Sequence, residues 1–299
     1  MKLGIIGLGK LGEYYLRDFK KFKINSIVLK NSNYNSSIRK SKLLNKKYNI
    51  KIKAAKNYKK FFNNHFETTL ICSPSSFHLN HLKRALKNNR DIIIEKPIIK
   101  LKKNKSKKWA LQNLAKIFDY NKKIYYNLIN EYYAEKYIKL FRNFKFCYKK
   151  FDFIFHTNGT HNFEEIVDDL LPHLFSILDK VHKYKKIHKI KKIIKKKRCK
   201  LQFYADNCFC NIEFLQGVKK KKLKFGIDKY LVERQIFEKN ETLSIFLNCK
   251  KTNEKIKVSN PLTENIKRIV HNQQSYNKRD EYNKILNNLT KCCEIFYAK

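Results

Sequence analysis

The stretch Thr68–Pro97 constrains the fold more than any other part of the chain. Two short apolar runs, Leu70–Cys72 and Ile92–Ile94, flank a segment whose apolar residues recur at helical spacing. This pattern predicts a strand–helix–strand unit with two buried parallel strands. Ligands of such sheets lie at the carboxyl ends of the strands. We therefore expect a binding site beside the polar residues there: Ser73, Ser75, His78, Glu95 and Lys96.

A glycine-rich turn near the start of the chain leads to the same kind of site. The apolar run Leu3–Ile6 is followed by G-x-G-x-x-G and then by a helical pattern, which is the order expected for dinucleotide binding. The glycines permit a tight turn and close approach to a pyrophosphate, and the helix supplies free N–H donors. Three of the seven glycines of the chain lie here. The six candidate cofactor-binding residues of the turn are Gly7, Leu8, Gly9, Lys10, Leu11 and Gly12.

The end of the second predicted strand bears on which cofactor binds. This strand, Ser26–Leu29, is followed by Lys30, Asn31 and Ser32, whereas NAD enzymes usually place an acid there to bind the ribose hydroxyls. The missing acid and the available cation favour the 2′-phosphate of NADP. Lysine is abundant throughout, so the missing acid is the better evidence, and both NADP and NAD stay open.

The net charge of +43 allows two interpretations. It could indicate a protein that binds nucleic acid or an anionic membrane. Only nine of the 68 basic residues are arginine, however, and the lysines are spread over nearly every segment, as a compositional bias produces. Nucleic acid is therefore not the expected partner. The densest basic cluster, Lys183–Lys200, could still dock an anionic surface.

Length and cysteine usage set the broad class. A chain of 299 residues can bury a full core and predicts two domains. Met1 and Lys2 lead straight into an apolar strand, so we expect no signal peptide, and no apolar run has the length of a membrane span. The eight cysteines include no C-x-x-C pair, which argues against a metal site. Reduced thiols in the cytoplasm are the expectation.

The second half of the sequence changes character. Aromatic and β-branched residues at near-alternating spacing predict an antiparallel sheet over four segments: Phe144–Thr157, Lys200–Gln216, Leu223–Phe237 and Thr242–Asn248. Helices are predicted at Phe163–His182 and Asp280–Tyr297. We therefore expect an α/β dinucleotide-binding Rossmann domain with a parallel sheet over residues 1–130. An α+β domain with an open, mostly antiparallel sheet would follow over residues 131–299.

These motifs resemble the Gfo/Idh/MocA family of NAD(P)-dependent oxidoreductases. The matching pieces are the glycine turn, Ser73-Pro74 with His78 four residues further on, and the run that ends in Glu95-Lys96-Pro97. The segment Asp169–His173 resembles the D-x-x-x-H element of the active-site helix in that family. The resemblance implies a Rossmann domain followed by a domain with an open sheet, and it places six residues beside the cofactor: Ser73, Pro74, Ser75, His78, Glu95 and Lys96.

The resemblance also implies catalytic roles for Lys96, Asp169 and His173. Asp169 and His173 are four residues apart, so on a helix both would face the same way. Pro172 is tolerated near a helix start, which predicts that the pair lies in the first turn. A histidine can take a hydroxyl proton and a lysine can stabilise an alkoxide, and which residue is the base stays open. Alternatively, Asp168 replaces Asp169, or His173 is an ordinary helix histidine.

The sequence thus predicts a cytoplasmic oxidoreductase that transfers hydride between NADP or NAD and a carbinol carbon of a sugar, cyclitol or nucleotide sugar. One alternative is a non-catalytic dinucleotide-binding regulator on the same fold, and another is a nucleic-acid-binding protein. The resemblance further implies a homo-oligomer assembled through the sheet of the second domain.

Overall fold

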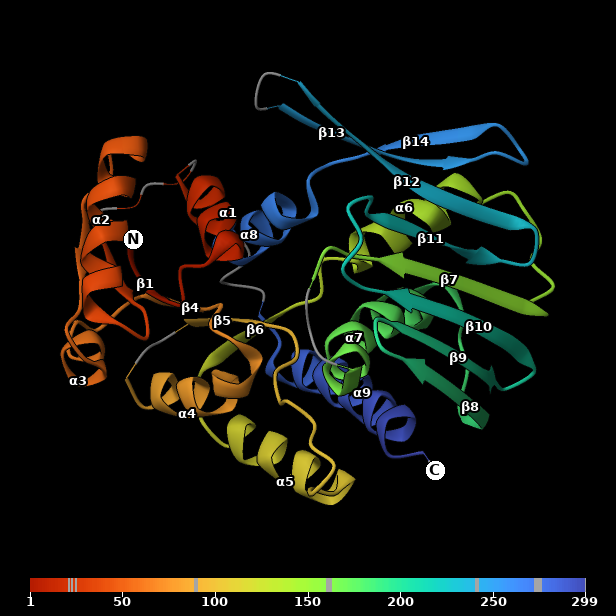
Figure 1. Cartoon of the computed structure of the whole chain (residues 1–299), viewed down its shortest axis with the longest axis horizontal. Helices are drawn as coiled ribbons and strands as arrows, with labels where there is room; N and C mark the ends of the chain where they lie inside the picture. Colours follow the sequence, from red (N-terminus) through yellow and green to blue (C-terminus); the bar gives the residue numbers. More distant parts are fainter. Residues whose placement is uncertain are drawn as a thin grey trace. The chain divides into compact units, whose positions relative to one another are not determined.

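The computed structural model describes residues 1–298 apart from 21, 23, 25, 89, 90, 160–162, 240, 241 and 272–275. The chain forms two compact units (Figure 1). Unit 1 contains Met1–Asn127 and Leu262–Leu289, and unit 2 contains Leu128–Pro261 and Thr290–Lys299. The sequence predicted a single boundary near residue 130, whereas the segment Leu262–Leu289 also belongs to unit 1.

Unit 1 is built on a six-stranded parallel sheet with the strand order β3-β2-β1-β4-β5-β6. All five strand pairs are parallel. The strands are β1 (Lys2–Ile6), β2 (Ser26–Lys30), β3 (Ile52–Ala54), β4 (Thr68–Ile71), β5 (Asp91–Glu95) and β6 (Lys123–Asn127). The order changes direction at β1, so the crevice between the ends of β1 and β4 is where a doubly wound sheet binds its ligand. The predicted Rossmann-type parallel sheet is confirmed.

Helices lie on both faces of this sheet (Figure 1). They are α1 (Lys10–Phe19), α2 (Tyr34–Tyr48), α3 (Tyr58–Phe62), α4 (His78–Asn88) and α5 (Lys107–Phe118). A 3₁₀ turn, Ser75–Phe77, leads into α4. Each parallel strand needs such a crossover, and the apolar residues of α4 are buried on the face that packs against the sheet.

A return of the chain completes unit 1. Helix α8 (Pro261–His271) begins this segment, and the first residues of α9 (Lys278–Tyr297) end it. The hydroxyl of Thr263 donates to the buried carboxylate of Asp18 at 2.8 Å, and the amide of Asn265 donates to that of Asn127 at 2.7 Å. Buried polar groups require such partners, so these bonds fix where α8 packs.

Unit 2 is built on an eight-stranded sheet with the order β14-β13-β12-β11-β7-β10-β9-β8. Every neighbouring pair is antiparallel except β7 with β10. The strands are β7 (Lys150–His156), β8 (Ile187–Lys195), β9 (Arg198–Ala205), β10 (Cys208–Leu215), β11 (Lys222–Ile227), β12 (Tyr230–Lys239), β13 (Thr242–Cys249) and β14 (Glu254–Val258). The prediction of a mostly antiparallel second sheet is confirmed.

Two helices, α6 (Glu131–Leu140) and α7 (Phe163–Val181), lie on one face of this sheet (Figure 1). Alternate residues of β7 point toward them, and Phe151, Phe153 and Phe155 are all buried. The intervening side chains of β7 lie on the other face, where Ile154 is only partly buried. Within the described residues of unit 2, helices therefore cover one face of the sheet and not the other, as the alternating pattern predicts.

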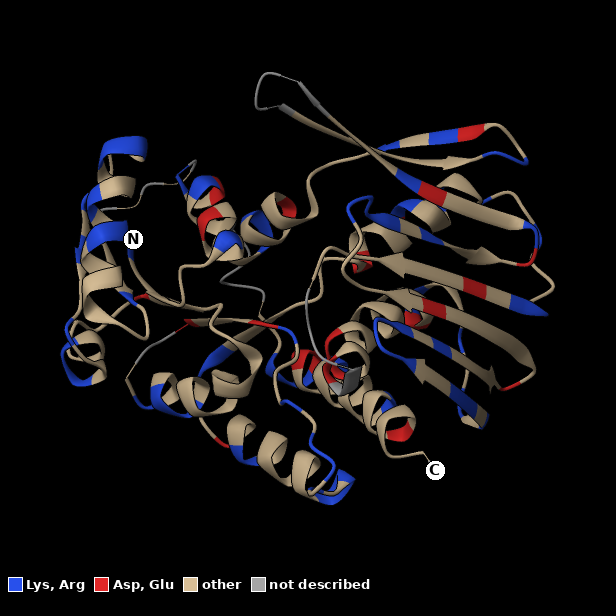
Figure 2. Ribbon diagram, viewed as in Figure 1, with Lys and Arg blue, Asp and Glu red and all other residues tan. Residues whose placement is uncertain are grey.

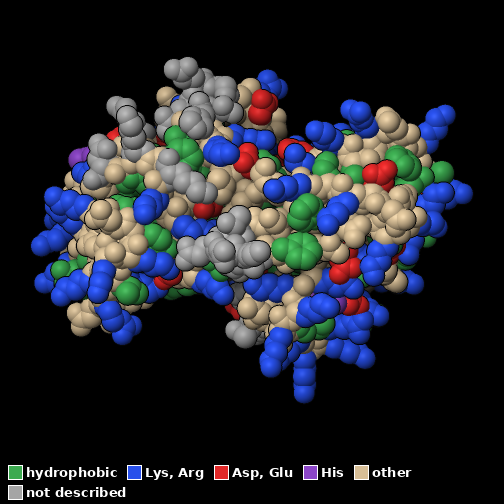
Figure 3. Space-filling model, turned by 90° about the horizontal axis from the view of Figure 1, so that it is seen from above, with side chains coloured by type: hydrophobic (Ala, Val, Ile, Leu, Met, Phe, Trp, Pro, Cys, Tyr) green, Lys and Arg blue, Asp and Glu red, His purple; other side chains and the backbone are tan. Residues whose placement is uncertain are grey.

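Lysine and arginine residues are distributed over helices and strands of both units rather than on one element (Figure 2), and their side chains are spread over the face seen in Figure 3. The cluster Lys183–Lys200 forms the edge strand β8 and its turn into β9, and most of its lysines are exposed. Within the described ranges, no helix combines the length and apolar character that crossing a membrane requires.

Candidate functional site

The glycine turn joins β1 to α1 at the carboxyl edge of the parallel sheet. Gly7 has φ +87°, and a Cβ added there would lie 2.5 Å from the Cα and N atoms of Ser73. The turn therefore packs directly against the residues that follow β4. Gly9, in contrast, has no atom within 4 Å of an added Cβ and precedes the first residue of α1. This open backbone beside a helix N-terminus fits a pyrophosphate.

Residues at the end of β2 and directly after it contact the same turn. The side chain of Asn31 accepts a hydrogen bond from the backbone N–H of Leu8 at 2.8 Å. Lys30 is 4 % exposed, its ammonium group donates to the carbonyl of Asn31, and burial lowers its pKa. Ser32 is exposed. Lys30 is thus turned inward, while Lys40 of α2 donates to the carbonyl of Leu8 and also lies beside the turn.

A buried polar cluster lies below the end of β5. Glu95 accepts hydrogen bonds from the hydroxyl of Tyr15 and the amide of Asn127, and it is 5 % exposed. Burial raises the pKa of Glu95, which the two hydrogen bonds and the nearby charge of Lys96 partly offset. Its carboxylate therefore holds α1, β5 and β6 together. Lys96, the next residue, is half-buried.

The predicted residue His78 connects two strand ends. It is 1 % exposed, with Nε2 located 2.7 Å from the carbonyl oxygen of Ser73 and Nδ1 located 2.8 Å from that of Pro97. The first residue of α4 therefore links the segment after β4 to the segment that contains Lys96. The structure thus brings together Gly7, Ser73, His78 and the backbone next to Lys96.

Sequence reasoning missed a second histidine in this helix. The Nδ1 atom of His81 lies 2.9 Å from the hydroxyl of Ser73, and its Nε2 atom lies 2.7 Å from the hydroxyl of Tyr58. Burial, and then the charges of His78, Arg84 and Lys30, lower the pKa of His81 to about 4. The available signal was its spacing, because residues three apart share a helix face.

His81 predicts a specific pH dependence of stability. An unfolded histidine titrates near 6.5, so between pH 6.5 and about 4 the unfolded state binds more protons than the folded state. The contribution of neutral His81 is complete above pH 6.5 and is lost as the pH falls through that window. Between pH 7 and pH 4.5, the free energy of unfolding should therefore fall by roughly 2 kcal/mol less in His81→Asn than in wild type, as measured by urea unfolding at both pH values. Equal losses in wild type and variant would contradict this assignment.

The position of Asp169 and His173 differs from the prediction. Helix α7 begins at Phe163, so the pair lies beyond the first turn, and Pro172 is inside the helix. Proline lacks only the N–H that would bond the carbonyl of Asp168, and the rest of the helix continues around it. His173 is 8 % exposed and its ring lies 5.1 Å from that of Phe155, whereas Asp169 is half-buried and Asp168 is 4 % exposed.

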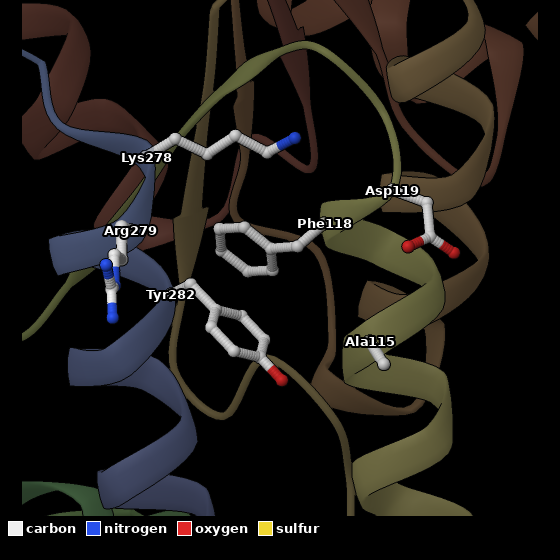
Figure 4. Close-up of a pocket in the computed structure, with 6 residues that line it drawn as sticks. All are labelled: Ala115, Phe118, Asp119, Lys278, Arg279 and Tyr282. Carbon is white, nitrogen blue, oxygen red and sulfur yellow. The ribbon is translucent and has the colours of Figure 1, made fainter.

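A separate pocket of about 420 Å³ lies in unit 1 between the end of α5 and the start of α9 (Figure 4). Phe118 and Tyr282 pack edge to face across it, with ring centroids 5.0 Å apart. The other residues that line it are Ala115, Asp119, Lys278 and Arg279. Helix α5 ends before β6 begins, so this pocket lies toward the amino ends of the strands. None of the predicted site residues lines it.

Comparison with family models matches residues 1–124 to the Gfo/Idh/MocA model, described as an oxidoreductase family with an NAD-binding Rossmann fold. The match covers the glycine turn, the three residues Lys30, Asn31 and Ser32 at and after the end of β2, and the segments after β4 and β5. No curated protein matches the chain.

Solved structures of similar fold extend over nearly the whole chain. A UDP-N-acetylglucosamine 3-dehydrogenase from Acidithiobacillus ferrooxidans has a TM-score of 0.66 at 11% identity, covering 99% of this chain and 97% of that one. A 3-ketoreductase from Actinomadura kijaniata, in complex with TDP-benzene and NADP, has a TM-score of 0.71 at 9% identity, covering 99% and 96%. A myo-inositol 2-dehydrogenase from Lactobacillus plantarum has a TM-score of 0.66 at 13% identity, with the same coverage. The resemblance to the Gfo/Idh/MocA oxidoreductases is therefore confirmed by the family model over residues 1–124. The solved structures show the same fold over nearly the whole chain.

Proposed function

We propose that this protein is an NAD(P)-dependent oxidoreductase that transfers hydride between the cofactor and a carbinol carbon of a sugar, cyclitol or nucleotide sugar. The observation that carries the proposal is the glycine turn. Gly9 leaves open backbone at the start of α1, in a domain whose sequence matches an NAD-binding Rossmann family. NADP is slightly favoured over NAD, because β2 ends at Lys30 and is followed by Asn31 and Ser32, with no acid at this position.

The proposed chemistry needs a hydride acceptor and a proton acceptor. The bound dinucleotide supplies the nicotinamide carbon that accepts or releases hydride. Lys96 would donate a hydrogen bond to the substrate oxygen and stabilise its developing negative charge. His173 would hold or release the hydroxyl proton, with Asp169 orienting it, and either Lys96 or His173 could be the base. Residues on Gly7–Gly12, Ser73–Ser75 and His78 would hold the cofactor, with Glu95 fixing the strand end beneath Lys96.

Substrate and assembly belong to the same proposal. The neighbours named above act on a nucleotide sugar and on myo-inositol, which supports a polyhydroxylated substrate without choosing among the classes. The uncovered face of the eight-stranded sheet is the surface we propose for homo-oligomer formation, and it carries the exposed Phe237. A cytoplasmic location stays a prediction from the eight cysteines, all of which are free thiols.

Cofactor binding tests the proposal directly. Trp109 is the only tryptophan and lies in unit 1, on α5. We expect saturable quenching of its emission by NADPH and weaker quenching by NADH, followed by turnover with at least one member of a panel of nucleotide sugars, free sugars and cyclitols. Absence of binding by either dinucleotide would refute the proposal.

The burial of His173 favours one second candidate, a non-catalytic dinucleotide-binding regulator. A histidine that is 8 % exposed and packed against Phe155 is also what an ordinary core histidine looks like. The two candidates differ in a measurable way. In an oxidoreductase, the wild-type protein would turn over at least one panel substrate, and His173→Ala would abolish that turnover. In a regulator, the wild-type protein would bind the cofactor and turn over no substrate of the panel.

A further inference from the structure

Three polar side chains form a continuous line from α3 to the end of β4. The hydroxyl of Tyr58 contacts Nε2 of His81 at 2.7 Å, and Nδ1 of His81 contacts the hydroxyl of Ser73 at 2.9 Å. His81 is 6 % exposed, and its ring contacts those of Tyr58 and Phe77, with centroids 5.1 and 5.8 Å away. All of these residues belong to unit 1.

The neutral imidazole of His81 can donate a hydrogen bond to only one of the two hydroxyls, that of Tyr58 or that of Ser73. A neutral imidazole has one N–H and one acceptor nitrogen, so it must donate to one hydroxyl and accept from the other. Burial of the ring, and then the nearby groups His78, Arg84 and Lys30, lower the pKa of His81 and so disfavour a second proton on the ring. The direction of the hydrogen bond at Tyr58 therefore fixes the direction at Ser73.

The cations around Tyr58 select the direction. The ammonium group of Lys30 lies 4.9 Å from the ring centroid of Tyr58, and the guanidinium group of Arg84 lies 5.0 Å from it. Burial raises the pKa of Tyr58 and keeps its hydroxyl protonated, while the charge of Arg84 partly offsets that rise and makes the hydroxyl a better donor and a poorer acceptor. Tyr58 would then donate to Nε2, and Nδ1–H would donate to the oxygen of Ser73. The hydroxyl hydrogen of Ser73 is left to bond a third group.

Ser73 lies at the binding crevice of the sheet, so the group that accepts its hydroxyl hydrogen would be a bound ligand. Its backbone packs against Gly7, and it follows β4, the strand that neighbours β1 at the point where the sheet order changes direction. This is the crevice in which a doubly wound sheet binds a dinucleotide. The carbonyl of Ser73 is engaged by His78. His81 and Tyr58 therefore fix the direction in which the hydroxyl of Ser73 can donate a hydrogen bond.

We propose that Tyr58 and His81 are positioning residues that orient the hydroxyl of Ser73 to donate a hydrogen bond to an oxygen atom of the bound dinucleotide. This inference rests on the proposed function for its ligand. It assigns to two residues outside the sequence motifs a role in cofactor affinity, without direct contact between either residue and the cofactor.

The role predicts a pattern of affinities among single variants. Ser73→Ala, His81→Leu and Tyr58→Phe should each raise the KM for NADPH about tenfold with kcat unchanged, which is the loss of one hydrogen bond to an oxygen acceptor. His81→Asn should restore most of the affinity, because the asparagine amide nitrogen occupies nearly the position of Nδ1 and can donate to Ser73. Tyr48→Phe, which removes a phenolic hydroxyl from α2, is the matched control and should have no effect.

The double variant gives the decisive comparison. If Tyr58 acts through Ser73, adding Tyr58→Phe to Ser73→Ala should change the KM for NADPH by less than about twofold. A full additional tenfold loss, or a Tyr58→Phe variant that binds NADPH as wild type does, would overturn the inference.

A measurement without cofactor separates this inference from the proposed function. ¹⁵N NMR of histidine-labelled free protein should show His81 protonated at Nδ1 in wild type, with Nε2 becoming protonated in Tyr58→Phe. If wild type binds neither NADPH nor NADH, the proposed function fails and the ligand part of the inference fails with it. If binding occurs but His81 carries its proton on Nε2 in wild type, the inference fails alone.

Discussion

Replacing Lys96 by methionine is expected to lower kcat about a thousandfold and to leave most of the NADPH affinity in place. The methionine keeps much of the apolar stem of lysine but has no charge to stabilise a substrate alkoxide. Lys96 is half-buried and follows Glu95, whose carboxylate is fixed by Tyr15 and Asn127, so the backbone at this position should be unchanged. Steady-state kinetics and a NADPH titration of the same preparation separate the two effects.

The control is another lysine of the same connection. Lys103 is exposed and lies between β5 and α5, so Lys103→Met changes the net charge equally without touching the strand end. It should keep wild-type kcat. Turnover of Lys96→Met within tenfold of wild type would show that Lys96 has no part in the chemistry, and an equal fall in the control would assign the loss to net charge.

The sequence predicted those parts of unit 1 whose strands and helices show a complete pattern within a short stretch of the chain. The βαβ unit over residues 68–97 has continuous apolar strands and an amphipathic helix, and both signals are complete within thirty residues. Helix α2 and strand β3 were not predicted individually. Helix α2 buries two serines, Ser37 and Ser41, along with Leu44 and Tyr48, and β3 has only three residues, so neither leaves a long periodic apolar pattern.

The return of the chain to unit 1 has no local signal at all. Single hydrogen bonds between residues far apart in sequence help to fix its position, such as Thr263 with Asp18 and Asn265 with Asn127. A polar residue in a helix of ordinary composition does not reveal which distant partner it will meet. For this reason the sequence placed residues 262–289 with the second domain.

Some residues of the candidate site have a local sequence signal and others do not. Glycine turns and strand ends predict where backbone meets ligand, so Gly7, Gly9, Ser73 and His78 could be named from the sequence. Side chains that act through other side chains, such as His81, have no such marker. Pro172 was misleading, because a proline inside a helix costs one backbone hydrogen bond that the packing of α7 outweighs.

The two alanine variants of the glycine turn should separate folding from cofactor binding. Gly7→Ala is expected to lower the free energy of unfolding by about 3 kcal/mol or more, because φ is +87° and the new Cβ would lie 2.5 Å from backbone atoms of Ser73. Gly9 has φ −82° and open space around an added Cβ. Gly9→Ala should therefore keep or slightly raise stability, by about 0.5 kcal/mol.

The same Gly9→Ala variant should nevertheless bind NADPH at least tenfold more weakly, since its methyl group would occupy the space through which a pyrophosphate approaches the backbone. Urea unfolding and NADPH titration on both variants provide the test. Because the added methyl meets nothing in the free protein, any loss of affinity in Gly9→Ala must arise from the ligand. Wild-type affinity in this variant would place the phosphates elsewhere and would remove the observation on which the proposed function depends.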